Sequence, residues 1–355
     1  MTRIPVAVLG ATGIVGQRLV AALENHPSFR AAELVASSRS AGKPYASAVD
    51  WRLPGDVPSG SASLVVRPLE ESIESRVVLS ALSADLALGS EERFANEGRA
   101  VISNASAHRM GRDIPLLIPE VNPGHARLID AQRARRGGPG FIATNPNCST
   151  VAVAMALAPL HRAFTVKRAI VVTLQALSGA GLPGVPALSI ADNVIPFIDG
   201  EAPKIEAETA RILGTVSSDH VDPAPITMSA RVHRVPISDG HMAAISVELG
   251  RDVAPEEAAR ALAEFSGPPQ ELRLPSAPLR PIHVLDGPRP QPALDRGREN
   301  GMAVSVGSIE RCPVLGLRLE ALVHNTIRGA AGAAMLNAEW LLATGVLDAS
   351  LRGRA

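Results

Sequence analysis

Cysteine and aromatic residues are scarce in this sequence, and each scarcity excludes a class of protein. The 355 residues include only two cysteines, Cys148 and Cys312, too few for a disulfide framework and without the spacing of metal ligands. Phenylalanine, tyrosine and tryptophan make up 3%, and the formal net charge is zero. Neither stacking surfaces nor excess positive charge therefore favour nucleic acid. We expect no metal ion, no nucleic-acid partner and two free thiols.

Long hydrophobic runs are also missing, since no segment approaches the roughly 18 consecutive apolar residues of a membrane-spanning helix. The chain begins directly with a strand-like pattern instead of a targeting segment. We therefore expect a cytoplasmic protein that has no membrane partner. Hydrophobic residues at 46% and charged residues at 20% are typical of a globular chain, and 355 residues suffice for two domains.

The first part of the chain alternates in the way that is typical of a parallel sheet covered by helices. Residues 4–9 are an apolar, β-branched run that ends at a glycine, and a helical period of apolar residues follows from residue 13. Further apolar runs lie at residues 33–36, 64–66, 77–82 and 100–103. The predicted fold class here is α/β, with a Rossmann-type dinucleotide-binding domain over residues 1–145.

After residue 145 both the strand-like segments and the loops become longer. Residues 169–174, 243–249 and 317–323 have the composition of strands, which predicts an α+β second domain over residues 146–325 on a more antiparallel sheet. The proline-rich residues 268–292 are predicted to form an irregular surface loop. A small-residue helix, within a segment of about 326–355, is predicted to pack back on the first domain.

Three glycines between the first strand and the first helix, at positions 10, 13 and 16, predict a nucleotide site. Such a turn lets the backbone approach a pyrophosphate, and the free amides and positive end of the helix favour its charge. A turn that is tight only for packing reasons is the alternative. The position of the turn in the first strand–helix unit favours the nucleotide.

The residues after the second predicted strand favour NADP over NAD. An NAD site would have an Asp or Glu there for the ribose hydroxyls, whereas this sequence has Ser37, Arg39 and Ser40. Hydroxyl groups and a guanidinium suit the 2′-phosphate of NADP. For a single arginine such as Arg39, a solvated loop charge is the ordinary alternative.

Cys148 lies at the predicted start of a buried helix. The apolar run of residues 151–158 follows it, and Asn147 and Ser149 are possible N-caps. Because a helix N-terminus stabilises a thiolate, we predict a thiol pKa that is lowered toward the reactive range. A buried, inert cysteine is the alternative, and we retain it for Cys312, whose neighbours suggest no such activation.

A thiol nucleophile needs a base, and the candidates for it are histidines. His241 follows a probable strand and turn, from which a side chain can project into a cleft. Spacing alone leaves His108, His233 and His324 as competitors.

Two basic residues are candidates for binding an anionic substrate. Arg109 lies in the polar stretch 103–109, and Lys204 is one of only three lysines in the chain. A solvated surface charge remains the ordinary explanation for either residue taken alone.

Together these stretches resemble the aspartate-semialdehyde dehydrogenase family, particularly its archaeal and fungal branch. The similarity runs from residues 10–17 to residues 324–332 and includes residues 103–110, 115–122, 144–150, 175–181 and 192–198. Jointly these stretches are highly specific. The resemblance implies that the second domain is a catalytic and dimerisation domain, and that the protein is a homodimer or homotetramer.

The resemblance also implies roles for individual residues. Cys148 would be the nucleophile, Gln175 would orient the acyl group, and His241 would be the acid or base. In the substrate, Arg234 would hold the carboxylate, Glu201 the amino group, and Arg109 and Lys204 the phosphate. The implied NADP(H) site consists of Gly10, Thr12, Gly13, Val15, Ser37, Arg39 and Ser40, with Asn325 near the nicotinamide end.

The implied activity is the NADPH-dependent reduction of L-aspartyl-4-phosphate to L-aspartate 4-semialdehyde through a cysteine thioester, a step toward lysine, threonine and methionine. Malonyl-CoA and succinyl-CoA reductases are the closest alternative, because they resemble this branch and use the same thioester with CoA as leaving group. N-acetyl-glutamyl-phosphate reductase is a second, although its acylated amine needs no carboxylate such as Glu201. A catalytically silent nucleotide-binding regulator is the third, and it would not explain Cys148, Gln175 and His241 together.

Overall fold

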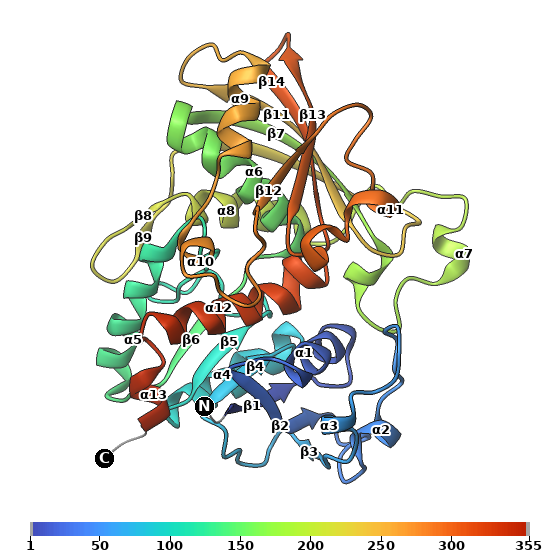
Figure 1. Ribbon diagram of the computed structural model, residues 1–355, viewed down its shortest axis with the longest axis vertical. Coiled ribbons are helices and arrows are strands. Elements are labelled where there is room, and N and C mark those ends of the chain that lie inside the picture. The colour runs from blue at the N-terminus through green and yellow to red at the C-terminus, as the bar shows by residue number, and fades with distance from the viewer. Residues whose placement is uncertain (1–2, 353–355) are drawn as a thin grey trace.

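The computed structural model describes residues 3–352 and consists of two halves, each built around a six-stranded sheet (Figure 1). The N-terminal half is coloured blue to cyan in Figure 1, and the second half above it runs from green to orange. The C-terminal helices, in red, lie along the first half.

The first sheet is entirely parallel. Its order is β3 (Val66–Pro68), β2 (Phe29–Ala36), β1 (Ile4–Leu9), β4 (Val77–Ser80), β5 (Ala100–Ser103) and β6 (Phe141–Thr144). This strand order, 3-2-1-4-5-6, is that of the doubly wound dinucleotide-binding fold. The predicted Rossmann-type sheet is therefore confirmed.

Both faces of this sheet are buried, which explains its continuous apolar strands. Val6 and Val8 face a core that includes α1 (Ile14–Glu24) and α12 (Gly332–Ala343), whereas Ala7 and Leu9 face a second core under α4 (Ala84–Asn96). The other helices of this half are α2 (Tyr45–Ala48), α3 (Ser59–Ala62), α5 (Leu128–Arg136) and α13 (Asp348–Arg352), with the 3-10 turn η1 (Pro123–Arg127).

The second sheet is mixed, as the prediction of an α+β second part requires. Its order is β10 (Thr227–Arg234), β7 (Val166–Gln175), β11 (His241–Leu249), β14 (Gly316–Val323), β13 (Val304–Cys312) and β12 (Ile282–Leu285). The two outermost pairs are parallel and the three inner pairs are antiparallel.

One face of the second sheet packs on α6 (Cys148–Phe164), an almost wholly buried helix. Burial alternates along β7 and β11, so every second side chain faces α6. The opposite face is more open, with Ile170 48% exposed. The other elements of this half are α7 (Ala187–Ile190), α8 (Glu201–Ile212), α9 (Pro255–Ala263), α10 (Pro268–Glu271), α11 (Pro292–Asp295), the hairpin β8 (Thr215–Val216) and β9 (Val221–Asp222), and the 3-10 turns η2 (Leu177–Ala180) and η3 (Arg298–Gly301).

The prediction that residues 268–292 form an irregular loop is wrong in part. They contain α10 and the edge strand β12, which pairs with β13 in parallel. The strand is only four residues long and has prolines at positions 281 and 288 on either side. An edge strand forms backbone hydrogen bonds with a single neighbouring strand, so the flanking prolines do not prevent β12 from forming.

The end of the chain returns to the first half. After β14 a π-helical turn, η4 (Ile327–Ala331), leads into α12, which contacts α1 and β5. Met335, Leu336 and Trp340 are buried in the same core as Val6 and Val8. Residues 353–355 of the predicted C-terminal segment lie outside the described residues.

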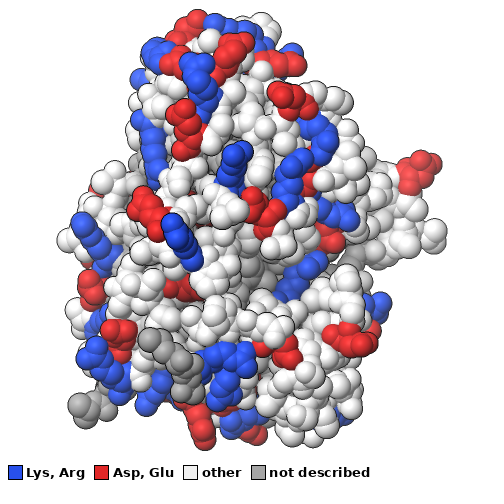
Figure 2. Space-filling view, viewed as in Figure 1, with Lys and Arg blue, Asp and Glu red and all other residues white. Residues whose placement is uncertain are grey.

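The surface carries charges of both signs, as the zero net charge requires. On the face shown in Figure 2, acidic and basic side chains are interspersed. Within residues 3–352, none of the helices combines the length and the apolar character needed to cross a membrane. The same residues contain no group of three His, Cys, Asp or Glu side chains that could hold a metal ion.

Candidate active site

The glycine turn between β1 and α1 leaves no room for side chains. Gly10 has a φ of +73°, and a Cβ there would lie 2.6 Å from the Ala81 carbonyl oxygen. A Cβ on Gly16 would lie 2.1 Å from the Gly10 carbonyl oxygen. Gly13 is the N-cap of α1 and makes no side-chain cap, so the amides at the start of that helix are open to a ligand.

A pocket of about 350 Å³ lies beside this turn, and four of the predicted nucleotide-binding residues line it: Gly10, Thr12, Gly13 and Ser37. Val15 packs instead against the first core. The exposed Arg39 side chain has no hydrogen bond or ion pair within residues 3–352, and Ser40 follows it. Sequence reasoning missed Leu82, Ser83 and Leu86, which come from the end of β4 and the start of α4 and complete the wall.

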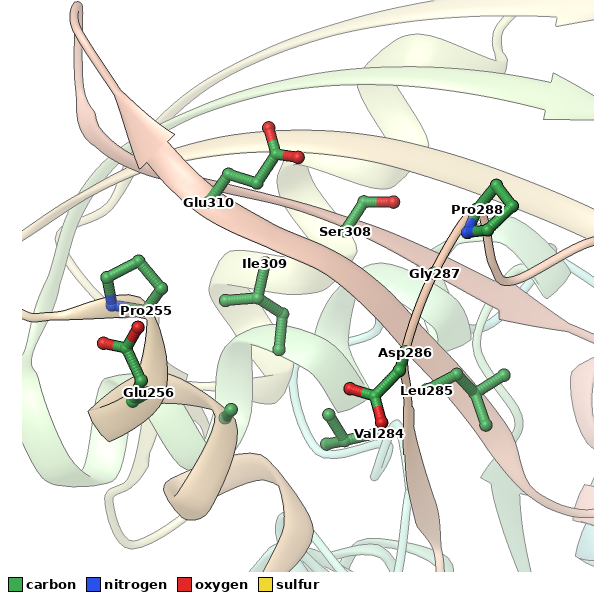
Figure 3. A pocket seen from close by; sticks show the side chains of 11 residues that line it. Pro255, Glu256, Val284, Leu285, Asp286, Gly287, Pro288, Ser308, Ile309 and Glu310 are labelled. Atoms are coloured by element: carbon green, nitrogen blue, oxygen red, sulfur yellow. The ribbon is translucent and has the colours of Figure 1, made fainter.

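A larger hollow, of about 550 Å³, lies elsewhere. Figure 3 shows it between the start of α9, the end of β12 and the middle of β13, with Glu256, Asp286 and Ile309 among its lining residues. It contains none of the predicted site residues. Pocket size therefore does not identify the functional site in this fold.

Cys148 is the first residue of α6, as the sequence predicted. The side-chain oxygen of Asn147 accepts hydrogen bonds from the backbone N–H groups of Ser149, at 2.9 Å, and Thr150, at 3.3 Å. Asn147 is thus the N-cap of the helix, and Ser149 lies inside it.

The predicted lowering of the thiol pKa is wrong. Burial, and then the negative charge of Glu201, raise the pKa of Cys148 to about 12. Arg109, Arg234 and a hydrogen bond from the backbone of Ser149 oppose these effects and are outweighed. Cys148 keeps some exposed surface, but its thiol is enclosed by protein, where an uncompensated thiolate is costly.

Three predicted residues converge at one edge of the second sheet. Gln175 and Arg234 end the parallel strands β7 and β10 and are register partners, and His241 begins the antiparallel neighbour β11. Asn325 follows the end of β14, which pairs with β11, so it reaches the same edge. Residues from four strands therefore meet where α6 begins.

His241 is fully buried at this edge and is held by backbone groups. Its Nδ1 accepts a hydrogen bond from the N–H of Ala176 at 3.0 Å, and its Nε2 has no hydrogen-bond partner within residues 3–352. Burial, and then the charge of Arg234, lower the pKa of His241 to about 3, although a hydrogen bond with Gly240 opposes them. The imidazole is neutral at physiological pH.

The loop after β7 closes over these residues. Arg234 donates a hydrogen bond from Nη1 to the Ala176 carbonyl at 2.7 Å, and a Cβ on Gly179 would lie 2.8 Å from that Nη1 and 2.9 Å from Nε2 of His241. Asn325 joins the loop to the turn before His241: its Nδ2 donates to Ser178 Oγ, and its Oδ1 accepts from the N–H of Gly240, both at 2.8 Å.

The side chain of Gln175 is buried at the end of β7. Its amide donates a long hydrogen bond, 3.3 Å, to the hydroxyl of Thr173. The carboxamide therefore has hydrogen-bonding capacity left for a ligand.

Helix α8 places three residues on the face that meets the start of α6. Glu201 accepts hydrogen bonds from Asn147 Nδ2, at 2.8 Å, and from Lys204 Nζ, at 3.0 Å. Glu208 accepts hydrogen bonds from the backbone N–H of Asn147, at 2.6 Å, and from Arg109 Nη1, at 3.0 Å. Sequence reasoning missed Glu208, although its spacing from Glu201 and Lys204 (i, i+3, i+7) places it on the same helix face.

Of the remaining candidates, His108, His233 and Cys312 lie outside this cluster, whereas His324 is close enough to His241 for its charge to act on it. His108 is buried near Ala87 and Glu91, and His233 precedes Arg234 on β10, so the two side chains point to opposite faces of the sheet. His324 lies beside Asn325, and burial lowers its pKa to about 4. Cys312 lies at the opposite end of the second sheet, where it pairs with Gly316 across the β13–β14 hairpin.

Two family models match this chain, and together they define its class. The NAD binding domain of semialdehyde dehydrogenases matches residues 5–129, and the dimerisation domain of semialdehyde dehydrogenases matches residues 157–328. The chain belongs to the aspartate-semialdehyde dehydrogenase family, as its similarity to individual proteins shows.

The aspartate-semialdehyde dehydrogenase of Methanothermobacter thermautotrophicus is 48% identical over 339 residues, which cover 94% of this chain and 97% of that protein. The crystal structure of aspartate semialdehyde dehydrogenase with NADP from Candida albicans matches with a TM-score of 0.90 and 40% identity, over 97% of this chain and 100% of that one. The malonyl CoA reductase (NADP) of Metallosphaera sedula is 39% identical over 349 residues, 96% of this chain and 98% of that protein.

Proposed function

We propose that this protein reduces L-aspartyl-4-phosphate to L-aspartate 4-semialdehyde with NADPH, through a thioester on Cys148. The observation that carries the proposal is the convergence of Cys148, Gln175, Arg234 and His241 where α6 begins. The names of the relatives at 43–48% identity support the same reaction.

NADP(H) fits the first half of the chain. The Gly10 and Gly16 backbones are too close to their neighbours for any Cβ, which is the kind of turn that admits a pyrophosphate. Gly13, Thr12 and Ser37 line the adjacent pocket. The exposed guanidinium of Arg39, which has no partner among residues 3–352, suits a 2′-phosphate. When bound, the reduced nicotinamide supplies a hydride to the acyl carbon. Asn325 lies next to the catalytic edge and would meet the nicotinamide end.

Cys148 and His241 would start the reaction as an uncharged pair. With the thiol pKa raised to about 12 and the imidazole pKa lowered to about 3, a thiolate–imidazolium pair is disfavoured in this enclosed site. The proton therefore leaves sulfur as the carbon–sulfur bond forms and the bond to phosphate breaks, and the departing phosphate is the group that takes it. Because Nδ1 of His241 accepts from the N–H of Ala176, Nε2 carries the ring proton and can donate it to the carbonyl oxygen as negative charge develops there. When the hemithioacetal later collapses to the aldehyde, the sulfur recovers a proton.

The charges around Cys148 suit an acyl phosphate that also carries an amino acid head. Arg234 would bind the carboxylate and Glu201 the amino group, while Gln175 would orient the reacting carbonyl. Arg109 and Lys204 would offset the charge of the leaving phosphate. Lys204 is 37% exposed and its i, i+3 contact with Glu201 is part-buried, so its ammonium group can also reach a substrate phosphate.

A second candidate reaction has coenzyme A as the leaving group in place of phosphate, and one observation supports it. A malonyl CoA reductase is 39% identical to this chain over nearly its full length, so the scaffold is compatible with a thioester substrate. The acyl–cysteine and the reduction step would be the same, and only the group displaced by sulfur would differ.

One assay separates the two. Aspartate semialdehyde is supplied with NADP and either phosphate or coenzyme A, and NADPH formation is followed for wild type, Cys148→Ala and the control Cys312→Ala. We expect phosphate-dependent turnover in wild type and the control, and none in Cys148→Ala. Turnover with coenzyme A alone would refute the acyl-phosphate reaction, and an active Cys148→Ala variant would refute the nucleophile.

We also infer that the protein assembles as a homodimer or homotetramer. The match of residues 157–328 to a dimerisation domain and the open outer face of the second sheet support this assembly. Light scattering after size exclusion measures the mass, and a monomer at micromolar concentration would refute it.

A further inference from the structure

Glu208 connects two parts of the site that are far apart in the sequence. It lies on α8 and is only 2% exposed, so its carboxylate has left water and depends on its protein partners. One oxygen accepts from Arg109, and the other accepts from the backbone N–H of Asn147, the residue before Cys148. Glu208 therefore spans 99 positions to one partner and 61 to the other.

Asn147 is held at both of its nitrogen atoms by α8. Glu208 accepts from its backbone nitrogen, and Glu201 accepts from its side-chain nitrogen at 2.8 Å. The side-chain oxygen of Asn147 then points back to cap α6, where it accepts from Ser149 and Thr150. Helix α8 thereby sets the orientation of the residue that fixes the start of the Cys148 helix.

Arg109 is restrained by the same carboxylate. Its Nη1 donates to Glu208, its Nη2 donates to the Asn104 carbonyl at 2.7 Å, and its buried Nε has no partner within the described part of the chain. The charge of Arg109 favours the Cys148 thiolate, as does that of Arg234. A carboxylate that is bonded to Arg109 offsets part of that charge.

We propose that Glu208 is a positioning residue that holds Arg109 and the start of the Cys148 helix in register and limits the effect of Arg109 on the thiol. The proposal rests on Cys148 being the nucleophile of the proposed function. The charged groups that face the thiol are Glu201 from α8, Arg234 from β10 and Arg109 from the segment after β5. Glu208 acts on the thiol through the last of these and through Asn147.

Two substitutions distinguish the effect of the negative charge of Glu208 from the effect of its side-chain length. Glu208→Gln keeps the length but has one acceptor oxygen, so its amide N–H₂ must face a donor at one of the two contacts. It also removes the negative charge beside Arg109. Glu208→Asp keeps the charge but is one methylene shorter, so it cannot bridge both partners. Glu206→Gln is the matched control, because Glu206 lies on the same helix and, among the described residues, accepts a hydrogen bond from the backbone N–H of Ala230 alone.

The first readout is alkylation of Cys148 by iodoacetamide in a Cys312→Ser background, measured between pH 7 and pH 9. In Glu208→Gln the thiolate is better stabilised, so we expect alkylation at a given pH to be about threefold faster or more. Glu208→Asp and Glu206→Gln should stay within about twofold of wild type. Equal acceleration in Glu208→Gln and Glu208→Asp would show simple loosening of the site and would overturn the electrostatic role.

The second readout is kcat/KM in the phosphate-dependent assay. Both Glu208 variants should lose about tenfold to a hundredfold, because small displacements of positioned groups are costly, and Glu206→Gln should lose little. Unchanged turnover in both variants would overturn the proposal. If Glu208→Gln does not fold, Glu208→Asp alone tests the proposal. Reduced turnover with a normal alkylation rate in Glu208→Asp supports the requirement for the length of the Glu208 side chain, and unchanged turnover refutes it. Alkylation needs neither substrate nor cofactor, so this test stands even where the proposed reaction fails.

Discussion

Gly329 lies so close to Cys148 that no side chain fits between them. A Cβ at position 329 would lie 2.8 Å from the Cβ of Cys148 and 3.1 Å from its Cα. Gly329 belongs to the buried π-helical turn η4, and such turns occur frequently at functional sites. The chain that returns from the second sheet therefore forms a wall directly against the candidate nucleophile.

Gly329→Ala should displace Cys148 or the π-helical turn. We expect turnover in the NADP-reduction assay to fall about tenfold or more, and the free energy of unfolding in urea to fall by about 1–3 kcal/mol. Gly89→Ala is the matched control, because a Cβ on that glycine of α4 meets nothing within 4 Å. It should be active and at least as stable as wild type. Wild-type turnover in Gly329→Ala would contradict the prediction.

Gly10→Ala should weaken NADPH binding, measured by fluorescence titration. The new Cβ would meet the Ala81 carbonyl at 2.6 Å, so the turn beside the pocket must move, and we expect Kd to rise about tenfold or more. Gly42→Ala controls for backbone strain, because Gly42 has a φ of +81° and open space around its Cβ position. Equal losses in the two variants would mean that strain alone, and not the close approach, weakens binding.

His241 should make the protein sensitive to acid. Because burial lowers its pKa to about 3, below the 6.5 of an exposed histidine, the unfolded chain binds a proton that the folded chain does not. This contribution to stability is present above pH 6.5 and is lost as the pH falls toward 3, at about 1.4 kcal/mol per pH unit for one proton. Urea unfolding of His241→Asn between pH 7 and pH 5 should show a slope that is shallower by about this amount. Identical slopes for variant and wild type would argue against the buried neutral imidazole.

Arg328 and Glu120 form a buried ion pair, 2.9 Å apart, that ties the π-helical turn to the first half of the chain. Arg328→Met alone leaves the Glu120 carboxylate buried without a cation, so we expect a loss of about 3–5 kcal/mol in urea unfolding. Adding Glu120→Gln should recover part of it. Arg311→Ala, in an exposed pair with Asp252, should change stability by less than about 1 kcal/mol. A loss of stability below about 1 kcal/mol in Arg328→Met would contradict the prediction.

The parallel first sheet could be predicted because its signals are local. The run of residues 4–9, the glycines that follow and the helical period of α1 are contiguous, and strands buried on both faces are apolar throughout. The edge strand β12 was missed because four residues between prolines look like a loop, and only their pairing with β13 makes them a strand.

Most residues of the site could be predicted from the sequence, but the pKa of the Cys148 thiol could not. The start of α6 at Cys148 was visible from Asn147 and the apolar run that follows. The pKa of the thiol depends on enclosure by α8 and β10, which no local pattern contains, and this enclosure outweighs the helix N-terminus. Glu208 was missed for a related reason, since its partners come from segments distant in the sequence.

The chain crosses between its two halves at β6 to α6 and again at η4 to α12, and the closeness of Gly329 to Cys148 places both crossings at one point. Both connections therefore run past the candidate nucleophile. The position of the Cys148 sulfur depends on the backbone of each half of the protein, and not on the start of α6 alone.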